Sequence, residues 1–472
     1  MVVVLALTPL LLDRLGLDRF GIWALALVVL NTLRILDGGI AASLARFFAV
    51  HAAGEDRVAA SRLMVGSLLF LALLGAVLTL VAIPVAPVLV EVLNVPDHLE
   101  GEAAMVLRWM PALAALALMG EATAALLVGH GRFRALAGTM WLSALIFGAA
   151  VIVFVGEGAH LEALMAAVAI RYGVLILANL GLGRGHLSFR RPFLPSRADV
   201  REVGSYSSRM QLSALSGFVN TELDAIVIAT FLPIRYVGLY QIGMQVATAL
   251  RSLPLFAFPP ILTRLTTILR LEGKQATGRE FERLERRWFS VVLGFGVVAI
   301  AAVAFAVPAW LGDDYVTSGG IAAILLAGYT VHVALTGMRT CYVRAIGRPG
   351  LEMRSSIAWT AINLALTIPL VIVAGVIGVV AATAAAGAVA SIYFVALCRR
   401  EEGLPLIAPP ASWWPLVGLG VLVTVAGELL IVETGLHGYF ALALTGLPAI
   451  LGWSLLAYSL RRMQRTRPLP VT

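Results

Sequence analysis

Apolar segments of about 20 residues, the length that an α-helix needs to cross a bilayer, recur from one end of this chain to the other. Lipid offers no hydrogen-bond partners, so spanning segments must be helices or closed barrels, and the alternating short strands of a barrel are absent. Only 13% of the 472 residues are charged, against roughly 25% in soluble domains. The sequence therefore predicts an all-α polytopic membrane protein.

The apolar segments predict about fourteen transmembrane helices, in two blocks of six followed by an extra C-terminal pair. The expected spans are about 1–12, 20–48, 61–93, 103–129, 135–156, 161–183, 204–232, 237–270, 286–311, 318–343, 353–375, 378–398, 413–434 and 438–460. The first is only half a span, so we expect helix 1 to be truncated.

An internal repeat explains the two blocks. Three pairs of similar sites lie at a nearly constant offset along the chain: 15–23 with 232–240, Arg34 with Arg251, and Gly131–Arg132 with Gly347–Arg348. Many carriers build two gates around a central site from pseudo-symmetric halves. The expected organisation is an N-lobe (1–183), a basic cytoplasmic linker (184–203), a C-lobe (204–398), and the extra pair with a cytoplasmic tail (399–472).

The basic residues support this topology. Of the 35 Lys and Arg residues, 28 fall near alternate loops on one side and 3 on the other. Cytoplasmic loops carry such an excess, which places the C-terminus in the cytoplasm. The net charge of +8 therefore reflects membrane topology, and we expect no nucleic-acid partner.

Two arginines occupy equivalent positions within apolar spans. A charge at the bilayer centre is costly, so Arg34 and Arg251 need a partner or a function. Asp37 lies three residues after Arg34 on the same helical face, which leaves a structural ion pair open as an explanation. Pro254 follows Arg251 and is expected to bend or break that helix. Because guanidinium groups bind phosphate oxygens in a bidentate manner, we expect both arginines to bind a diphosphate.

Other polar residues of the spans have less specific roles. Four acidic residues could couple transport to an ion or act as counter-ions: Asp37, Glu121, Glu222 and Asp224. Five amides could contact a sugar: Asn31, Asn220, Gln241, Gln245 and Asn363. The sequence contains no Gly-Lys-Ser/Thr phosphate-binding loop, no His-Glu-x-x-His and no Gly-x-Ser-x-Gly. We therefore expect no catalytic residues, metal or cofactor, and no ATPase activity of its own.

Several short motifs occur in a characteristic order. They are Leu15-Gly-Leu-Asp-Arg-Phe-Gly-Ile-Trp, Leu36-Asp-Gly-Gly-Ile, Arg46, Glu222-Leu-Asp, Val237-Gly-Leu-Tyr and Ala345-Ile-Gly-Arg-Pro. In this order, over about 1–398, the chain resembles bacterial polysaccharide-biosynthesis flippases of the multidrug/oligosaccharidyl-lipid/polysaccharide exporter superfamily. It departs from that pattern in the missing start of helix 1 and in having a single lysine, Lys274.

The resemblance implies a V-shaped pair of six-helix lobes with alternating access. The implied substrate is an undecaprenyl-diphosphate-linked oligosaccharide, flipped across the cytoplasmic membrane for surface polysaccharide biosynthesis. Basic cavity residues of such flippases hold the diphosphate, and the matching positions here are Arg34 and Arg251. The implied partners are this lipid-linked substrate, membrane lipids, and a polysaccharide polymerase and glycosyltransferases.

Two rival functions remain open. A cation-coupled multidrug exporter of the same superfamily would favour an acidic, aromatic-rich cavity, whereas the paired arginines favour an anionic substrate. An integral-membrane glycosyltransferase, ligase or polymerase would need a substantial extracytoplasmic loop with catalytic carboxylates. The short loops on the arginine-poor side argue against that enzyme.

Overall fold

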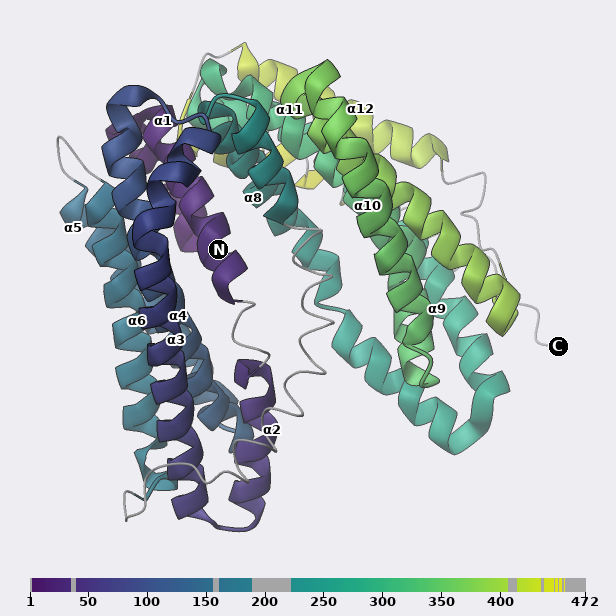
Figure 1. Ribbon diagram of the computed structural model, residues 1–472. Coiled ribbons are helices and arrows are strands. Elements are labelled where there is room, and N and C mark those ends of the chain that lie inside the picture. The colour runs from purple at the N-terminus through teal and green to yellow at the C-terminus, as the bar shows by residue number, and fades with distance from the viewer. Residues whose placement is uncertain are drawn as a thin grey trace. The chain divides into compact units, whose positions relative to one another are not determined.

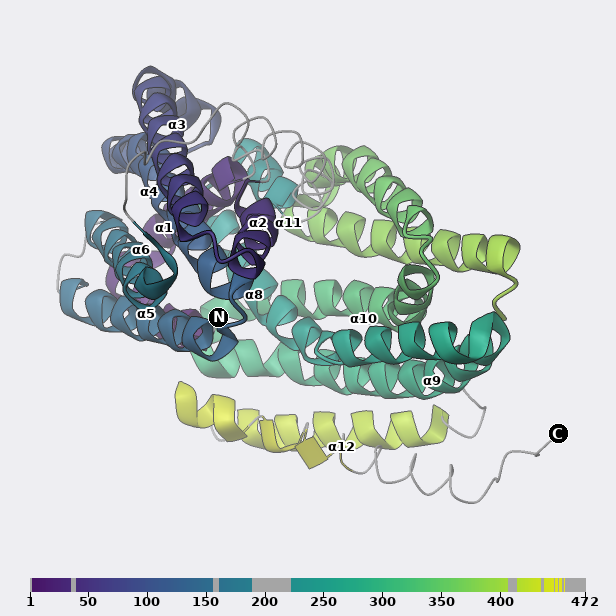
Figure 2. The same ribbon diagram turned by 90° about the horizontal axis from the view of Figure 1, so that it is seen from below.

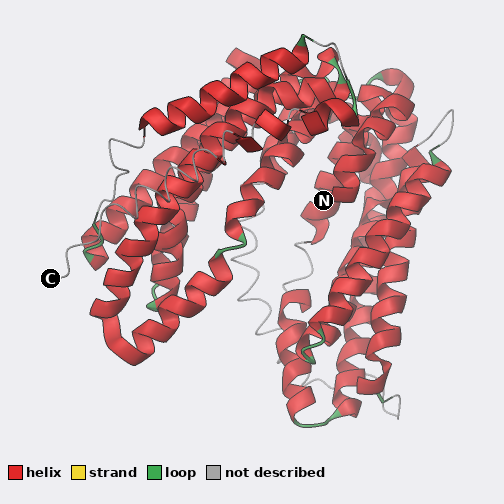
Figure 3. Cartoon of the chain, turned by 180° about the vertical axis from the view of Figure 1, so that it is seen from behind, coloured by secondary structure: helices red, strands yellow, loops and turns green. Residues whose placement is uncertain are grey.

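A computed structural model describes residues 2–34, 40–155, 161–188, 222–405, 414–433 and, with gaps at 445, 449 and 452–453, residues 437–454. The described residues form helices joined by short turns, without a strand among them (Figure 3). The chain divides into two compact units, Met1–Gly238 and Leu239–Thr472. The segment 222–238 therefore groups with the first unit, although the repeat assigns it to the C-lobe.

The first unit is built around a group of long helices that lie side by side (Figures 1 and 2). Its elements are α1 (Val2–Arg34), α2 (Ile40–Ala53), α3 (Arg57–Val92), α4 (Glu100–Gly129), α5 (Phe133–Phe154), α6 (Leu161–Gly183) and the helical segment 222–231. Asp56 caps α3 by accepting a hydrogen bond from the Ala59 amide at 2.8 Å. The interior carries mainly Leu, Val, Ala and Phe side chains.

The second unit places three long elements against one another, with a further helix along α9 (Figure 2). Its elements are α8 (Arg235–Leu255), which begins at the end of the first unit, α9 (Phe258–Leu311), α10 (Val316–Ala345), α11 (Gly350–Glu402) and α12 (Trp414–Val432). Helix α8 ends one residue after Pro254, and α9 begins with prolines in its first turn. This confirms that the expected span 237–270 is broken; the break lies at 256–257, two residues after Pro254 and just before Pro259 and Pro260, where prolines remove helical hydrogen bonds.

The two longest elements each contain a reversal of the chain at a glycine with positive φ. In α9, Arg264 and Glu280 form a 2.8 Å ion pair, although a straight helix would hold them about 24 Å apart. Gly273, with φ +83°, lies midway between them. In α11, Ser355 donates to the carbonyl oxygen of Ala390, 35 residues away, at 2.9 Å. Gly375, with φ +58°, is therefore the turn of an antiparallel helix pair.

The start of the chain contains two described helices. Helix α1 has a break at Gly16, where φ is +74° and ψ is 168°, and this break falls between the expected spans 1–12 and 20–48. The expected span 20–48 takes in the second part of α1 and much of α2. The intervening residues lie outside the described part of the chain.

The repeated Gly-Arg pairs form the same helix cap twice. After α4, the amides of Gly131 and Arg132 donate to the carbonyls of Val128 and Leu127 at 2.9 and 2.8 Å. After α10, Gly347 and Arg348 make the corresponding bonds to Arg344 and Val343 at 3.1 and 2.8 Å. This is the Schellman motif, which requires the left-handed conformation that glycine adopts readily. Donors and acceptors of one cap are related to those of the other by the offset of the internal repeat.

The other repeated motif brings its two copies into direct contact within the first unit. A Cβ atom at Gly21 would meet the backbone carbonyl of Ile234. A Cβ atom at Gly238 would lie 3.1 Å from Leu17 Cδ1 and 3.3 Å from its carbonyl oxygen. The repeat relates Leu17 to Ile234 and Gly21 to Gly238, so the two contacts are reciprocal.

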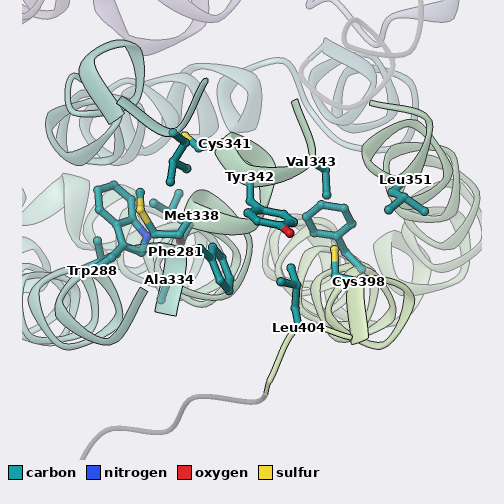
Figure 4. Close-up of a cluster of buried hydrophobic side chains, with 14 residues drawn as sticks. Phe281, Trp288, Ala334, Met338, Cys341, Tyr342, Val343, Leu351, Cys398 and Leu404 are labelled. Atoms are coloured by element: carbon teal, nitrogen blue, oxygen red, sulfur yellow. The ribbon is translucent and has the colours of Figure 1, made fainter. Parts of the chain in front are cut away.

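The interior of the second unit combines aromatic packing with a buried ion pair. Trp288 donates its indole N–H to the Val333 carbonyl at 2.8 Å, and Phe281 packs beside Tyr342 (Figure 4). Arg339 and Glu285, exposed by only 2% and 3%, pair at 2.8 Å. Because a lone buried charge is strongly destabilising, these two residues stabilise the α9–α10 contact only as a pair.

Eight of the described helical runs are long and apolar enough to cross a membrane. Two of them, residues 235–311 and 350–402, are longer than one crossing requires and contain the reversals at Gly273 and Gly375. The structure is thus that of an all-helical, multi-pass membrane protein.

The crossing of the two motif copies gives a stability prediction. Replacing Gly21 by alanine forces a methyl group against a backbone carbonyl, so we expect the free energy of unfolding to fall by about 1–3 kcal/mol. The free energy of unfolding should fall less in the Gly238→Ala variant, because the end of the Leu17 side chain can move away from the added methyl group. Gly173→Ala on α6, where nothing lies within 4 Å of the added atom, is the matched control. Unfolding in detergent titrations measures all three, and a neutral Gly21→Ala would contradict the close crossing.

Candidate functional site

In the first unit, the predicted residues cluster where α1 approaches the segment 222–231. The side-chain amide of Asn31 donates to Glu222 Oε1 at 3.2 Å. Asp224, two residues on, is 2% exposed and takes part in an interaction. The structure therefore brings together one predicted sugar-contacting residue, Asn31, and one predicted coupling residue, Glu222. Asn31 and Glu222 lie far apart along the chain, which explains why the sequence alone did not show the contact.

The other predicted residues of this unit are described less completely. Arg34 is the last residue of α1, one turn beyond Asn31, and its side chain lies outside the described residues. Asp37 and Asn220 also lie outside them. Glu121 is half-buried on α4 and takes part in an interaction.

Close to Glu121 along α4, the structure contains a polar network that sequence reasoning missed. Asn179 on α6 accepts a hydrogen bond from Thr139 at 2.7 Å and donates to Thr123 at 3.3 Å. All three side chains are buried. A single asparagine in an otherwise apolar span is the signal that could have revealed this network, because a buried amide needs partners.

In the second unit, α8 carries a polar stripe that ends at Arg251. Gln241, Gln245, Thr248 and Arg251 follow one another at steps of four, three and three residues, which places them on one helical face. Three polar atoms of this stripe are buried and lack a hydrogen-bond partner among the described residues: Gln245 Oε1, Thr248 Oγ1 and Arg251 Nε. Sequence reasoning missed Thr248, since a hydroxyl in a span usually bonds its own helix.

Arg251 contacts an aromatic ring. Its guanidinium carbon lies 4.4 Å from the centre of the Tyr329 ring on α10, a close cation–π contact. The Tyr329 hydroxyl in turn contacts the sulfur of Met244 at 3.3 Å. Within the described part of the chain, Arg251 forms no ion pair with a carboxylate. Its charge therefore faces an aromatic ring and not a carboxylate of the described residues.

One turn after Tyr329, His332 links α10 to α11. Its Nδ1 lies 2.9 Å from Ser391 Oγ, and its ring centre lies 4.5 Å from that of Trp359. These contacts fix the α10 face that carries Tyr329. His332 thus joins α10 to α11 one turn after Tyr329.

One predicted sugar contact has a different environment. Asn363 is 1% exposed, and its Oδ1 accepts hydrogen bonds from Thr367 and Thr383, each at 3.1 Å. Thr383 lies in the second helix of α11, beyond the Gly375 turn. In this conformation Asn363 therefore joins the two helices of α11.

The stripe on α8 can bind a ligand that is both anionic and rich in hydroxyls. Arg251 supplies a planar set of donors for phosphate oxygens, and the amides and hydroxyl beside it supply both donors and acceptors. A buried polar atom without a partner is destabilising until a ligand or water satisfies it. Nothing in this arrangement supplies a nucleophile with a paired base.

The aromatic contact of Arg251 can be tested by a double-mutant cycle. Combining Arg251→Gln with Tyr329→Leu should reveal a coupling free energy of about 0.5–2 kcal/mol in unfolding titrations. Tyr329→Phe retains the ring face and should keep most of that coupling. If the losses of unfolding free energy in Arg251→Gln and Tyr329→Leu simply add in the double variant, the ring does not orient the arginine.

The sequence of this chain is similar to those of proteins of polysaccharide and glycan biosynthesis. Residues 5–265 match the model of the family described as Polysaccharide biosynthesis protein. The curated Probable low-salt glycan biosynthesis flippase Agl15 of Haloferax volcanii is 23% identical over 244 residues. That match covers 50% of this chain and 48% of the relative, so the chain matches about half the length of that protein.

Solved structures show the same fold. The lipid II flippase MurJ, in an inward closed conformation, matches with a TM-score of 0.71 and 13% identity, over 98% of this chain and 97% of that one. A multidrug resistance MATE family transporter of the MOP superfamily, facing inward, matches with a TM-score of 0.62 and 16% identity, over 85% and 94%. At these identities the likeness concerns the fold alone. The family model covers more than half of the sequence, and this chain therefore belongs to the polysaccharide biosynthesis protein family, as its motifs predicted.

Proposed function

We propose that this chain is a flippase that moves an undecaprenyl-diphosphate-linked oligosaccharide across the cytoplasmic membrane by alternating access, for surface polysaccharide biosynthesis. The observation that carries the proposal is the α8 stripe, in which unsatisfied amide and hydroxyl groups lead to Arg251 without a carboxylate partner among the described residues. A diphosphate with attached sugars has the matching chemistry. The family membership and the flippase names of two similar proteins support the same function.

The proposed diphosphate site uses Arg34 and Arg251 together. Arg34 lies in α1 and Arg251 in α8, at positions that the internal repeat makes equivalent. A diphosphate has oxygens enough for two guanidinium groups, each binding in a bidentate manner. Gln241, Gln245, Asn31 and Asn220 are the proposed sugar contacts.

The proposed architecture has fourteen spans in two pseudo-symmetric six-helix lobes, 1–183 and 204–398, joined by 184–203 and followed by the pair in 399–472. The duplicated Schellman caps and the reciprocal Gly21–Ile234 and Gly238–Leu17 contacts support this symmetry. We place the C-terminus in the cytoplasm on the arginine distribution. A polysaccharide polymerase and glycosyltransferases are the proposed partners, because they would consume and supply the lipid-linked sugar.

The carboxylates Asp37, Glu121, Glu222 and Asp224 remain candidates for ion coupling or charge balance. The contact of Glu222 with Asn31 supports a link between coupling and substrate, because it joins a proposed coupling residue to a proposed sugar contact. A cation would compete with Asn31 for the Glu222 oxygen. Binding of that cation would therefore alter the α1 face that carries Asn31.

A cation-coupled multidrug exporter is the second candidate function. The observation in its favour is the fold shared with the MATE transporter. Such an exporter would need an acidic surface for cationic drugs, whereas the unpaired polar stripe here ends in an arginine. The third candidate, an integral-membrane glycosyltransferase or polymerase, is disfavoured because the similar proteins are named as flippases and transporters.

A flipping assay in proteoliposomes tests the proposal. Wild-type protein should move a fluorescent undecaprenyl-diphosphate sugar between leaflets, and Arg251→Gln or Arg34→Gln should slow this by at least tenfold, since a charged hydrogen bond contributes about 1.5–3 kcal/mol. Arg235→Gln is the matched control, because Arg235 is exposed at the start of the same helix α8.

The outcomes separate the candidates. Full activity in the double variant Arg34→Gln/Arg251→Gln would contradict the diphosphate site. Failure of the wild type on several lipid-linked sugars, together with ion-driven export of a cationic dye, would support the multidrug exporter instead.

A further inference from the structure

A pocket of about 480 Å³ opens on the second unit, and none of its lining residues belongs to the polar stripe of α8. Its walls come from the end of α8, the turn after it, both helices of α9, and α10. They include Leu253, Pro254, Ile261, Arg287, Val291 and Met338. The volume lies within the range of about 300–1,000 Å³ that is typical of ligand sites, and Arg287 is the one charged side chain in the wall.

The floor of the pocket is rigid. Trp288 lies beside Met338 in the core cluster (Figure 4), and its indole N–H is fixed on the Val333 carbonyl. Phe258 packs against Trp288 with ring centres 5.4 Å apart. The pocket is therefore not closed by rotation of its largest side chain.

The rim is apolar at one end and cationic at the other. Leu253 and Val291, exposed by 51% and 42%, border the opening. On α9, Arg287, Val291 and Phe295 form a stripe at steps of four residues, about 12 Å long. An apolar rim of this kind belongs in the hydrocarbon region, while the arginine belongs at the level of the lipid headgroups.

We propose that this pocket binds an anionic phospholipid of the surrounding leaflet. One acyl chain fills the apolar space between α8, α9 and α10, and Arg287 binds the phosphate of the headgroup. Water does not fill an apolar cavity, so a hydrocarbon chain is the occupant that satisfies the walls. The charge favours an anionic headgroup over a zwitterionic one, because basic side chains near a membrane surface attract anionic lipid.

The experiment measures lipid binding to the purified full-length chain by native mass spectrometry. The probes are phosphatidylglycerol and phosphatidylcholine with identical acyl chains. We expect the wild type to prefer phosphatidylglycerol, and Arg287→Gln to weaken that binding about fivefold while leaving phosphatidylcholine unchanged. Arg286→Gln is the matched control, since Arg286 is the exposed neighbour on α9 that does not line the pocket.

A second pair of variants tests the chain-binding part of the site. Val291→Trp fills the opening and should reduce binding of both lipids. Ile357→Trp places the same ring at an exposed position of α11 outside the pocket and should have no effect. Both variants are compared only after each is shown to keep the wild-type elution profile in size-exclusion chromatography.

Three results would overturn the proposal. They are equal binding of the two lipids by the wild type, equal losses in Arg286→Gln and Arg287→Gln, and unchanged binding in Val291→Trp. Binding of undecaprenyl phosphate with the same dependence on Arg287, in place of phosphatidylglycerol, would assign the pocket to a polyprenyl chain and equally overturn it. None of these results depends on flipping activity, so they are independent of the proposed transport function.

Discussion

The reciprocal contact of Gly21 with Ile234 and of Gly238 with Leu17 is the constraint on which the rest of the arrangement depends. Helices can approach this closely only where the residue at the crossing carries no side chain. The contact relates the second part of α1 to the start of α8 by the same repeat that relates Arg34 to Arg251. Each arginine follows its glycine by the same number of residues, about 20 Å along its own helix. The two arginines are therefore equivalent in their distance along the chain from the contacting glycines.

Charge pairing distinguishes structural arginines from the candidate site. Arg339 pairs with buried Glu285, and Arg19 makes a bidentate pair with Glu102 at 2.8 and 2.9 Å. Arg251, by contrast, faces the Tyr329 ring and forms no ion pair with a carboxylate among the described residues. We propose that its acceptor is the ligand of the candidate site, because leaving a charge unpaired in a low-dielectric region is unfavourable.

Features of the sequence that are local in the chain predicted the structure well. Apolar length located most helices to within a few residues, Pro254 located the break between α8 and α9, and the Gly-Arg pairs marked two identical caps. These features act through the backbone of a single turn or helix, which is why one sequence suffices to find them.

Features that depend on distant contacts could not be found in this way. The charged stretch near residue 280 is partly buried, because Glu285 faces an arginine on another helix. Asn363 carries an amide of the kind that can contact a sugar, but its side-chain oxygen accepts a hydrogen bond from Thr383, across the Gly375 turn. Tyr329 carries no sequence signal, because its importance arises from its position beside Arg251 in space.

The most direct test of the central claim is a binding cycle for undecaprenyl diphosphate with Arg34→Gln, Arg251→Gln and the double variant. If both arginines hold one diphosphate, each single change weakens binding at least tenfold. The affinity of the double variant should fall by less than the product of the two single effects. The reason is that losing one arginine already loosens the ligand, so that the other arginine contributes less in each single variant. Undecaprenyl monophosphate should show a smaller loss in each variant. Independent, additive losses, or equal effects on the two lipids, would contradict a shared diphosphate site.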